Sequence, residues 1–273
     1  MMIIEHDSQT ERMIRSMTEI QALVFFDLDG TLLNDQSQIT DDVAQSLKKM
    51  RENGIIPFIA TGRTNTEITD ILKKTGINSF ITMNGQYAVF EGQEIINHKI
   101  SADQAHALHE KANELNHQLA FYKHSGIILA SDSTMAQHHY EHLAQPVPPI
   151  EVPTFDEDTY NMLLILGQGH DEIYQKAFPE LTFYRNTPYS IDVVTCGHSK
   201  GTGVNEMLHY LGLDNVTTFA FGDGPNDLDL LRACDYSIAM GNAIDDLKRI
   251  ANYITSDHNN GGIVEALNYY HLI

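Results

Sequence analysis

Three short, uninterrupted apolar segments, separated by helical patterns, limit the folds that this chain can adopt. The segments are ALVFFD (22–27), IIPFIA (55–60) and SFITM (79–83). A continuous apolar run of this length is typical of a strand covered on both faces. Amphipathic helix patterns over 40–54 and 61–76 fill the intervals. Short alternating strands and helices predict an α/β fold with a Rossmann-like, doubly wound parallel sheet and right-handed crossovers.

The pattern changes after the third strand, at Asn84-Gly85. The segment QYAVFEGQEIINHKI (86–100) is typical of an antiparallel hairpin. Ser101 and Gln104 then form the capping-box signature of a helix. Further short strands are expected after this helix, in FYKHSGIILAS and NMLLILG. We therefore expect an inserted α+β unit.

The first pattern returns at SKGTGVNEMLHYLGL (199–213), which predicts a helix followed by another buried strand. We therefore expect three parts in the chain. An N-terminal extension covers residues 1–20, an α/β core domain covers 21–83 and 191–273, and an α+β cap domain covers 84–190.

The N-terminal extension lacks the apolar segment and the cleavage site of a secretory signal. Met17 stands just before the first strand, so the sequence leaves open whether residues 1–16 are a genuine part of the protein. Nothing later approaches the ~18 apolar residues of a membrane span. Cys196 and Cys234 lack metal or redox spacing and are expected to be small core residues. These features favour a cytoplasmic location.

The charge balance restricts the partners. Lys and Arg number 17 against 37 Asp and Glu, which gives a net charge of −20. A long anionic polymer or an anionic membrane is a poor partner for such a surface, so we expect no nucleic acid and no membrane. An anionic substrate would have to meet local positive charge or a metal ion.

Four polar stretches end predicted strands or begin helices: 27–31 (DLDGT), 61–63 (TGR), 200–201 (KG) and 222–227 (GDGPND). In a doubly wound sheet, ligands bind outside the carboxyl ends of the strands. We therefore expect these stretches to converge on one crevice. Their side chains include several carboxylates, one lysine and one threonine.

The carboxylates present an electrostatic problem that a metal would solve. Asp27 and Asp29 lie two residues apart in a strand, so both crowd one patch and repel. Oxygen ligands without histidine or thiol suit Mg²⁺. The candidate ligands are Asp27, Asp29, Asp223, Asn226 and Asp227. DLDGT also resembles a calcium loop, but the EF-hand pattern fails because threonine follows at the fifth position and no glutamate stands at the twelfth.

A phosphoryl-transfer reaction would use all of these groups. Asp27 can attack phosphorus and form an aspartyl-phosphate, while Asp29 can protonate the leaving oxygen and later activate water. Thr61 and backbone N–H groups of the DGT turn can bind the remaining oxygens. Lys200 can offset charge in the transition state.

The ordered motifs DLDGT, ATGR, SKG and GDGPND resemble those of the haloacid dehalogenase-like (HAD) superfamily. The long insertion, TMNGQY after the third strand and AMGNA near the end resemble its Cof-type subfamily IIB. The resemblance implies that Asp27 is the nucleophile and Asp29 the general acid/base. It also implies that the carboxylate of Asp27, the backbone carbonyl of Asp29 and the 223–227 loop hold the metal.

The resemblance implies further residues at the site. Thr61 and Lys200 are expected to bind phosphate, and Asn242 to lie near the metal loop. Candidates for substrate or phosphate binding lie within these motifs or in TMNGQY; they are Leu28, Gly62, Arg63, Asn84, Gly85 and Asn226. Because the second aspartate of DLDGT is present, the chain resembles the phosphatases of the superfamily rather than its dehalogenases.

These observations favour a Mg²⁺-dependent phosphatase that acts on a small phosphorylated metabolite, as a monomer or homodimer. Two alternatives stay open: a phosphomutase with the same motifs, and a non-catalytic sensor of phosphorylated metabolites. The sequence also contains an HHxxH run, formed by His138, His139 and His142. Two of these histidines could bind a metal from one helix face, but no third ligand is in view, so we expect a solvated helix face.

Overall fold

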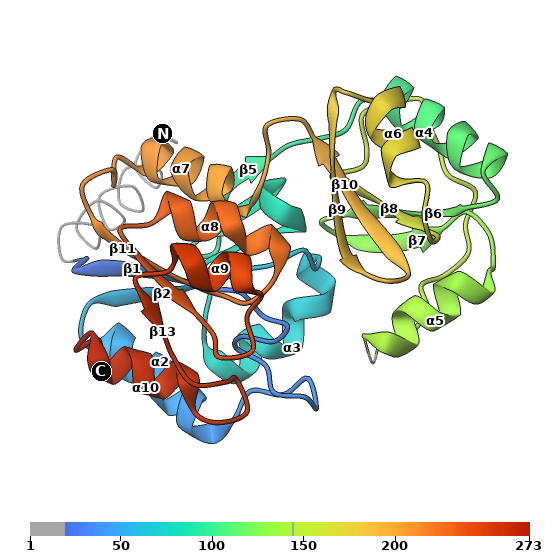
Figure 1. Cartoon of the computed structure of the whole chain (residues 1–273). Helices are drawn as coiled ribbons and strands as arrows, with labels where there is room; N and C mark the ends of the chain where they lie inside the picture. The colour runs from blue at the N-terminus through green and yellow to red at the C-terminus, as the bar shows by residue number, and fades with distance from the viewer. Residues whose placement is uncertain (1–19, 144) are drawn as a thin grey trace, which may run out of the picture.

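The computed structural model describes residues 20–143 and 145–273, and the predicted extension of residues 1–20 therefore lies almost wholly outside the described part. Two lobes are visible, a larger one that contains both the first and the last described elements and a smaller one inserted into it (Figure 1). Each lobe has its own sheet.

The larger lobe, the core, has an eight-stranded sheet in the order β13-β12-β11-β1-β2-β3-β4-β5. All pairs from β13 to β3 are parallel, which confirms the predicted α/β core with a parallel sheet. The strands are β1 (Ala22–Phe26), β2 (Ile55–Ala60), β3 (Phe80–Thr82), β4 (Tyr87–Phe90), β5 (Gln93–Asn97), β11 (Thr217–Gly222), β12 (Tyr236–Ala239) and β13 (Tyr253–Ile254).

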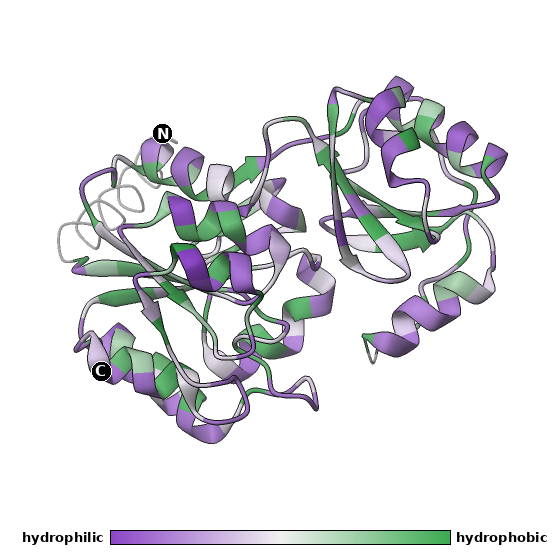
Figure 2. Ribbon diagram, viewed as in Figure 1, coloured by the Kyte–Doolittle hydropathy of each residue, from purple (hydrophilic) through white to green (hydrophobic). Residues whose placement is uncertain are grey.

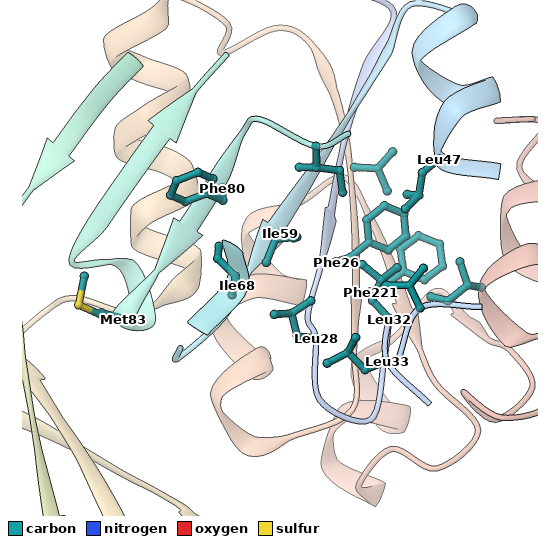
Figure 3. Close-up of a cluster of buried hydrophobic side chains, with 14 of the residues drawn as sticks. Phe26, Leu28, Leu32, Leu33, Leu47, Ile59, Ile68, Phe80, Met83 and Phe221 are labelled. Carbon is teal, nitrogen blue, oxygen red and sulfur yellow. The ribbon is translucent and has the colours of Figure 1, made fainter. Parts of the chain in front are cut away.

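Helices cover both faces of this sheet, because alternate residues of each central strand point to opposite sides. Val24 and Phe26 of β1 pack in one apolar cluster with α2 and α10, whereas Leu23 and Phe25 pack in another with α7, α8 and α9. Figure 3 shows part of the first cluster, with Phe26 and Phe221 beside Leu47 of α2. The helices are α2 (Asp41–Glu52), α3 (Asn65–Thr75), α7 (Lys200–Leu211), α8 (Leu228–Ala233), α9 (Asp245–Ile250) and α10 (Gly262–Tyr269).

The smaller lobe, the cap, is an antiparallel sheet with the order β7-β6-β8-β10-β9. Leu163 and Ile165 of β8 face α4 and α6, whereas Met162 and Leu164 face the other way, toward α5. The elements are α4 (Ala102–Glu114), β6 (Gln118–Lys123), β7 (Gly126–Leu129), α5 (Thr134–His142), β8 (Met162–Leu166), α6 (Asp171–Ala177), β9 (Leu181–Thr187) and β10 (Ser190–Thr195). Central strands of both sheets, among them β1, β2 and β8, consist mostly of apolar residues (Figure 2).

The structure differs from the predicted boundaries at both ends of the insertion. The hairpin β4–β5 pairs with β3 and extends the core sheet, although the sequence pattern assigned it to the cap. The predicted second boundary, at residue 190, falls at the start of β10, which belongs to the cap sheet. An antiparallel hairpin can join a parallel sheet at its edge, and the change of periodicity does not reveal which sheet it joins. The chain thus crosses between the lobes at 98–101 and 196–199.

Two helix ends that the sequence predicts are found in the structure. The predicted capping box of Ser101 and Gln104 begins α4, and Gly76 in the left-handed conformation (φ 68°) ends α3. Cys234 is partly buried, but Cys196 is exposed, so the expectation that it is a core residue is wrong. Within the described residues, none of the helices has the length and apolarity needed to cross a membrane.

Candidate active site

Three core strands end at the same point with a polar residue. Asp27 follows β1, Thr61 follows β2 and Asp223 follows β11. The chain runs from β1 to β2 on one side of the sheet and from β11 to β12 on the other, so the crevice between β1 and β11 is the place where doubly wound sheets bind ligands.

Lys200, the first residue of α7, reaches this point from the side. Its Nζ donates to Asp27 Oδ1 (2.5 Å) and to Asp227 Oδ1 (2.7 Å). The Lys200 side chain is only 1% exposed. Asp227 is fixed in turn, because its Oδ2 accepts hydrogen bonds from the backbone N–H groups of Asp223 (3.0 Å) and Gly224 (2.9 Å). A buried ammonium thus sits between two buried carboxylates.

The charges of this group are unbalanced. Burial raises the pKa of Asp27 well above its usual range, and the neighbouring Asp227 raises it further, while Lys200 acts in the opposite direction. Burial alone would lower the pKa of Lys200, but the two carboxylates raise it above its usual value, so its ammonium form is stabilised. Burial and Asp227 also raise the pKa of Asp223 to about 6. The three carboxylates of Asp27, Asp223 and Asp227 thus lie together beside the ammonium of Lys200.

Asp223 is oriented by groups from two other segments, the turn after β1 and the loop after β12. Its Oδ1 accepts from Thr31 Oγ1 (3.0 Å), and Asn242 Nδ2 donates to the carbonyl oxygen of Gly30 (2.8 Å) and lies 3.4 Å from Asp223 Oδ2. Asn242 therefore lies beside the acidic loop. Gly30 leaves room for the carboxylate, since a Cβ there would lie 2.4 Å from Asp223 Oδ2.

A divalent cation fits these residues by charge and by donor type. Carboxylate oxygens of Asp27, Asp223 and Asp227 lie within 4.8 Å of one another. Hard oxygen donors suit Mg²⁺. The oxygens of both Asp223 and Asp227 accept hydrogen bonds, so all three carboxylates stay candidate ligands. Asp227 also positions Lys200 and the loop.

Two other candidate ligands face elsewhere. The Asp29 side chain is 46% exposed and pairs with Arg63, whose Nε donates to Oδ2 (2.9 Å) and whose Nη2 donates to Oδ1. Asn226 Nδ2 donates to Asn84 Oδ1 (3.1 Å). A role for Asp29 in metal binding is thus left to its backbone carbonyl, whereas Asn226 contacts Asn84 through its amide nitrogen.

Asn84 connects the core to the cap. It adopts a left-handed conformation (φ 52°), and its Nδ2 donates to Asp192 Oδ2 of β10 (2.7 Å). The side chain of Asn84 is fully buried. A chain of hydrogen bonds therefore runs from η2 (Pro225–Asp227) through Asn84 of η1 (Met83–Gly85) to the cap sheet.

A cavity of about 250 Å³ lies between the lobes at this point. Core residues among its walls are Asp27, Asp29, Thr61, Gly62, Arg63, Glu67 and residues 223–227; cap residues are Tyr122, His139, His142, Leu143, Met162, Leu164, Thr187, Ser190 and Asp192. Thr61 is 2% exposed, and its Oγ1 accepts from the backbone N–H of Arg63 (3.2 Å).

Not every predicted residue lines the cavity. The Leu28 side chain is buried in the core cluster (Figure 3). Gly85 packs against α7, where a Cβ would lie 2.1 Å from the carbonyl oxygen of Ser199. Both positions can contribute only through the backbone or through packing.

The cap residues of the cavity were not predicted. Asp192 had a visible signal, since it is the one charged residue of the strand SIDVVT. His139 is 3% exposed, in contrast to the predicted solvated face, whereas His138 and His142 are exposed as expected. The remaining cap residues are apolar or hydroxyl side chains whose periodicity only indicates packing.

Comparisons with known proteins agree with this geometry. The sequence profile of the family described as haloacid dehalogenase-like hydrolase matches residues 24–267. YkrA of Bacillus subtilis, whose name ascribes a phosphatase activity to it, is 32% identical over 255 residues, which cover 90% of this chain and 96% of YkrA.

Solved structures are similar over nearly the whole described chain. A protein of Geobacillus kaustophilus HTA426 shares 33% identity and a TM-score of 0.83, covering 92% of this chain and 99% of its own. The HAD subclass IIB sugar phosphatase BT4131 shares 26% identity and a TM-score of 0.81, covering 93% of this chain and 100% of its own.

The chain belongs to the haloacid dehalogenase-like hydrolase family. It is an enzyme of the phosphatase type, and the resemblance to the Cof-type, subclass IIB branch is confirmed.

Proposed function

We propose that this enzyme hydrolyses small phosphorylated metabolites, such as sugar phosphates or related monoesters, in a Mg²⁺-dependent reaction that passes through an aspartyl-phosphate on Asp27. The observation that carries the proposal is the position of Asp27, beside the buried ammonium of Lys200 and at the wall of a cavity that the cap covers.

In the first half-reaction, a carboxylate oxygen of Asp27 attacks phosphorus and forms a new O–P bond, while the bond from phosphorus to the ester oxygen breaks. Asp29 donates a proton to that leaving oxygen. In the structure Asp29 is paired with Arg63, so it must exchange this partner for the leaving group when the substrate binds. Lys200 holds one Asp27 oxygen and orients the carboxylate.

In the second half-reaction, Asp29 takes a proton from water, and the water oxygen attacks phosphorus. The bond between phosphorus and Asp27 breaks, which releases phosphate and restores the carboxylate. Thr61 and the backbone of the turn after β1 bind phosphoryl oxygens throughout.

The cation would be held by Asp27, Asp223 and Asp227, with Asn226 supporting the loop. Mg²⁺ bound there supplies positive charge that balances the carboxylates and the phosphoryl oxygens. The excess of carboxylates over cations at this point supports a requirement for Mg²⁺.

The substrate class follows from the cavity. A volume of about 250 Å³ suits a small molecule, and Thr187, Ser190 and Asp192 of the cap offer polar groups for its hydroxyls. The sugar phosphatase activity named for BT4131 supports the same class. The cap would exclude water before attack and would supply the specificity contacts.

We further propose a cytoplasmic enzyme that functions as a monomer or homodimer without nucleic-acid or membrane partners. The two free cysteines and the net charge of −20 support this location and partner set.

The test is phosphate release from a panel of phosphorylated metabolites. We expect the wild type to release phosphate from one or more monoesters, to lose this activity with EDTA and to regain it with Mg²⁺. Asp27→Asn should lower the rate by a factor on the order of 10⁴ or more, while the far-ultraviolet circular dichroism stays unchanged. Phosphate release at the wild-type rate by Asp27→Asn would reject the mechanism.

Other outcomes of the panel would favour the alternative functions. Isomerised hexose phosphate without free phosphate would indicate a mutase instead, and no product from any monoester would indicate a sensor.

A further inference from the structure

The two segments that carry the chain between core and cap meet at a pair of histidines. His98 follows β5 at the start of the outward crossing, and His198 lies in the return crossing between β10 and α7. Their ring centroids are 4.4 Å apart. Glu206 of α7 lies against the same pair, with Oε2 2.8 Å and Oε1 3.0 Å from His98 Nε2.

These three side chains have the arrangement of metal ligands. One nitrogen of each imidazole and one oxygen of Glu206 lie within 4.8 Å of one another. The side chains of His98 and Glu206 are 34% and 44% exposed, so an ion can reach them from solvent.

The ring of His198 is held by a second layer of contacts. Its Nδ1 lies 2.9 Å from Thr195 Oγ1, and Thr195 exchanges hydrogen bonds with the side-chain amide of Gln86 (3.1 and 3.2 Å), which is fully buried. This contact occupies Nδ1 and leaves Nε2 as the nitrogen available to an ion. Ligand histidines are typically held by such a contact at their other ring nitrogen.

We propose that His98, His198 and Glu206 form a zinc site that fastens both crossings to helix α7. Two imidazoles and one carboxylate are a donor set that suits Zn²⁺, with a remaining position for water. This set differs from the carboxylates at the active site, which suit Mg²⁺. Zinc would replace the hydrogen bond between His98 and Glu206 with bonds from one ion to all three side chains.

The consequence concerns the motion of the cap. Both crossings have to flex if the cap opens to admit substrate, and an ion bound to residues of both crossings and to the core helix would restrict this motion. The proposal does not depend on the phosphatase mechanism, because none of the three residues lines the active-site cavity.

The test is zinc binding to the full-length protein, measured by competition with a chromogenic zinc chelator in millimolar Mg²⁺. Millimolar Mg²⁺ is added to compete for the active-site carboxylates, and any zinc that still binds there should be present in every variant. We expect the wild type to hold one zinc ion that His98→Ala and Glu206→Gln bind at least about 10-fold more weakly. Thr195→Val should weaken binding by about 10- to 100-fold through the lost support of His198.

His209→Ala is the matched control, because this exposed histidine lies on the same helix, three residues from Glu206. It should bind zinc like the wild type. Glu206→Gln keeps the size of the side chain, so it tests the proposal even if His98→Ala does not fold. Zinc should also slow amide hydrogen exchange at 98–101 and 196–199 in the wild type and in His209→Ala, but not in His98→Ala or Glu206→Gln. Equal zinc binding by the wild type and Glu206→Gln, or unchanged exchange at both crossings, would overturn the proposal.

Discussion

Lys200 shows how a single residue joins fold and chemistry. Its ammonium is buried between Asp27 and Asp227 and is supplied by the first turn of α7, whose N-cap Ser199 accepts from the backbone N–H of Thr202 (3.2 Å). Removing one partner from a buried charge network leaves the other charges uncompensated. The same lysine therefore stabilises the folded state and orients the proposed nucleophile.

Replacing this lysine should affect both properties. We expect Lys200→Met, which keeps the length of the side chain, to lower the free energy of unfolding by about 3–5 kcal/mol because two carboxylates stay buried without their cation. Phosphate release should be lost as well. Urea unfolding checks the first effect. Lys73→Met is the control, since Lys73 is 71% exposed and its surface pair with Asp70 contributes about 0–1 kcal/mol. Equal stability of the two variants would contradict this account.

His139 predicts a pH dependence of stability. Burial lowers its pKa to about 4 from the ordinary 6.5, so the unfolded chain takes up this proton first as the pH falls. The free energy of unfolding therefore falls as the pH drops from about 6.5 to about 4. At pH 5 the loss that His139 causes is roughly 2 kcal/mol. His139→Phe should reduce the loss of stability between pH 7 and pH 5 by this amount. An identical loss in wild type and variant, measured by urea unfolding, would exclude this cause.

Among the elements, those of the core were the most predictable. Apolar runs predicted β1 and β2, because nearly every residue of these strands is buried. Helical periodicity predicted α2 and α3, because only one face of each helix is buried. The cap was less predictable. β9, β10 and α6 were not assigned, and the hairpin β4–β5 was assigned to the wrong sheet. The periodicity of a strand does not reveal which sheet it joins.

The turn after β1 is an element whose sequence requirement can be tested. Gly30 has φ +80°, and a Cβ there would meet Asp223 Oδ2 at 2.4 Å. Gly92, in the turn between β4 and β5, has nearly the same φ of +81° but no atom within 4 Å of a Cβ. Gly30→Ala and Gly92→Ala should both lose about 1–2 kcal/mol of stability from the left-handed backbone.

Only Gly30→Ala should lose activity, because the added methyl group displaces the Asp223 carboxylate. We expect its rate of phosphate release to fall by a factor on the order of 100, whereas Gly92→Ala should keep the wild-type rate. Steady-state kinetics and thermal unfolding of both variants make the comparison. Similar rates for the two variants would show that the position of Asp223 is not critical.

At the scale of the whole molecule, the site forms where the lobes meet. The sequence motifs predicted its core half, because the ends of parallel strands converge on one edge. The cap half, which includes Tyr122 and Met162, could not be predicted, because these residues belong to a separate sheet whose position over the core is a tertiary property. Asn84 and Asp192 connect the two halves by a hydrogen bond.

The most direct test of the central claim is to trap the covalent intermediate on Asp27. Asp29→Asn should slow the second half-reaction, so that phosphoryl-enzyme accumulates when a substrate identified from the panel is added. After an acid quench and proteolysis, mass spectrometry should find the phosphoryl group on Asp27. Phosphorylation of a different residue, or none in a variant that still releases phosphate from that substrate, would contradict the account.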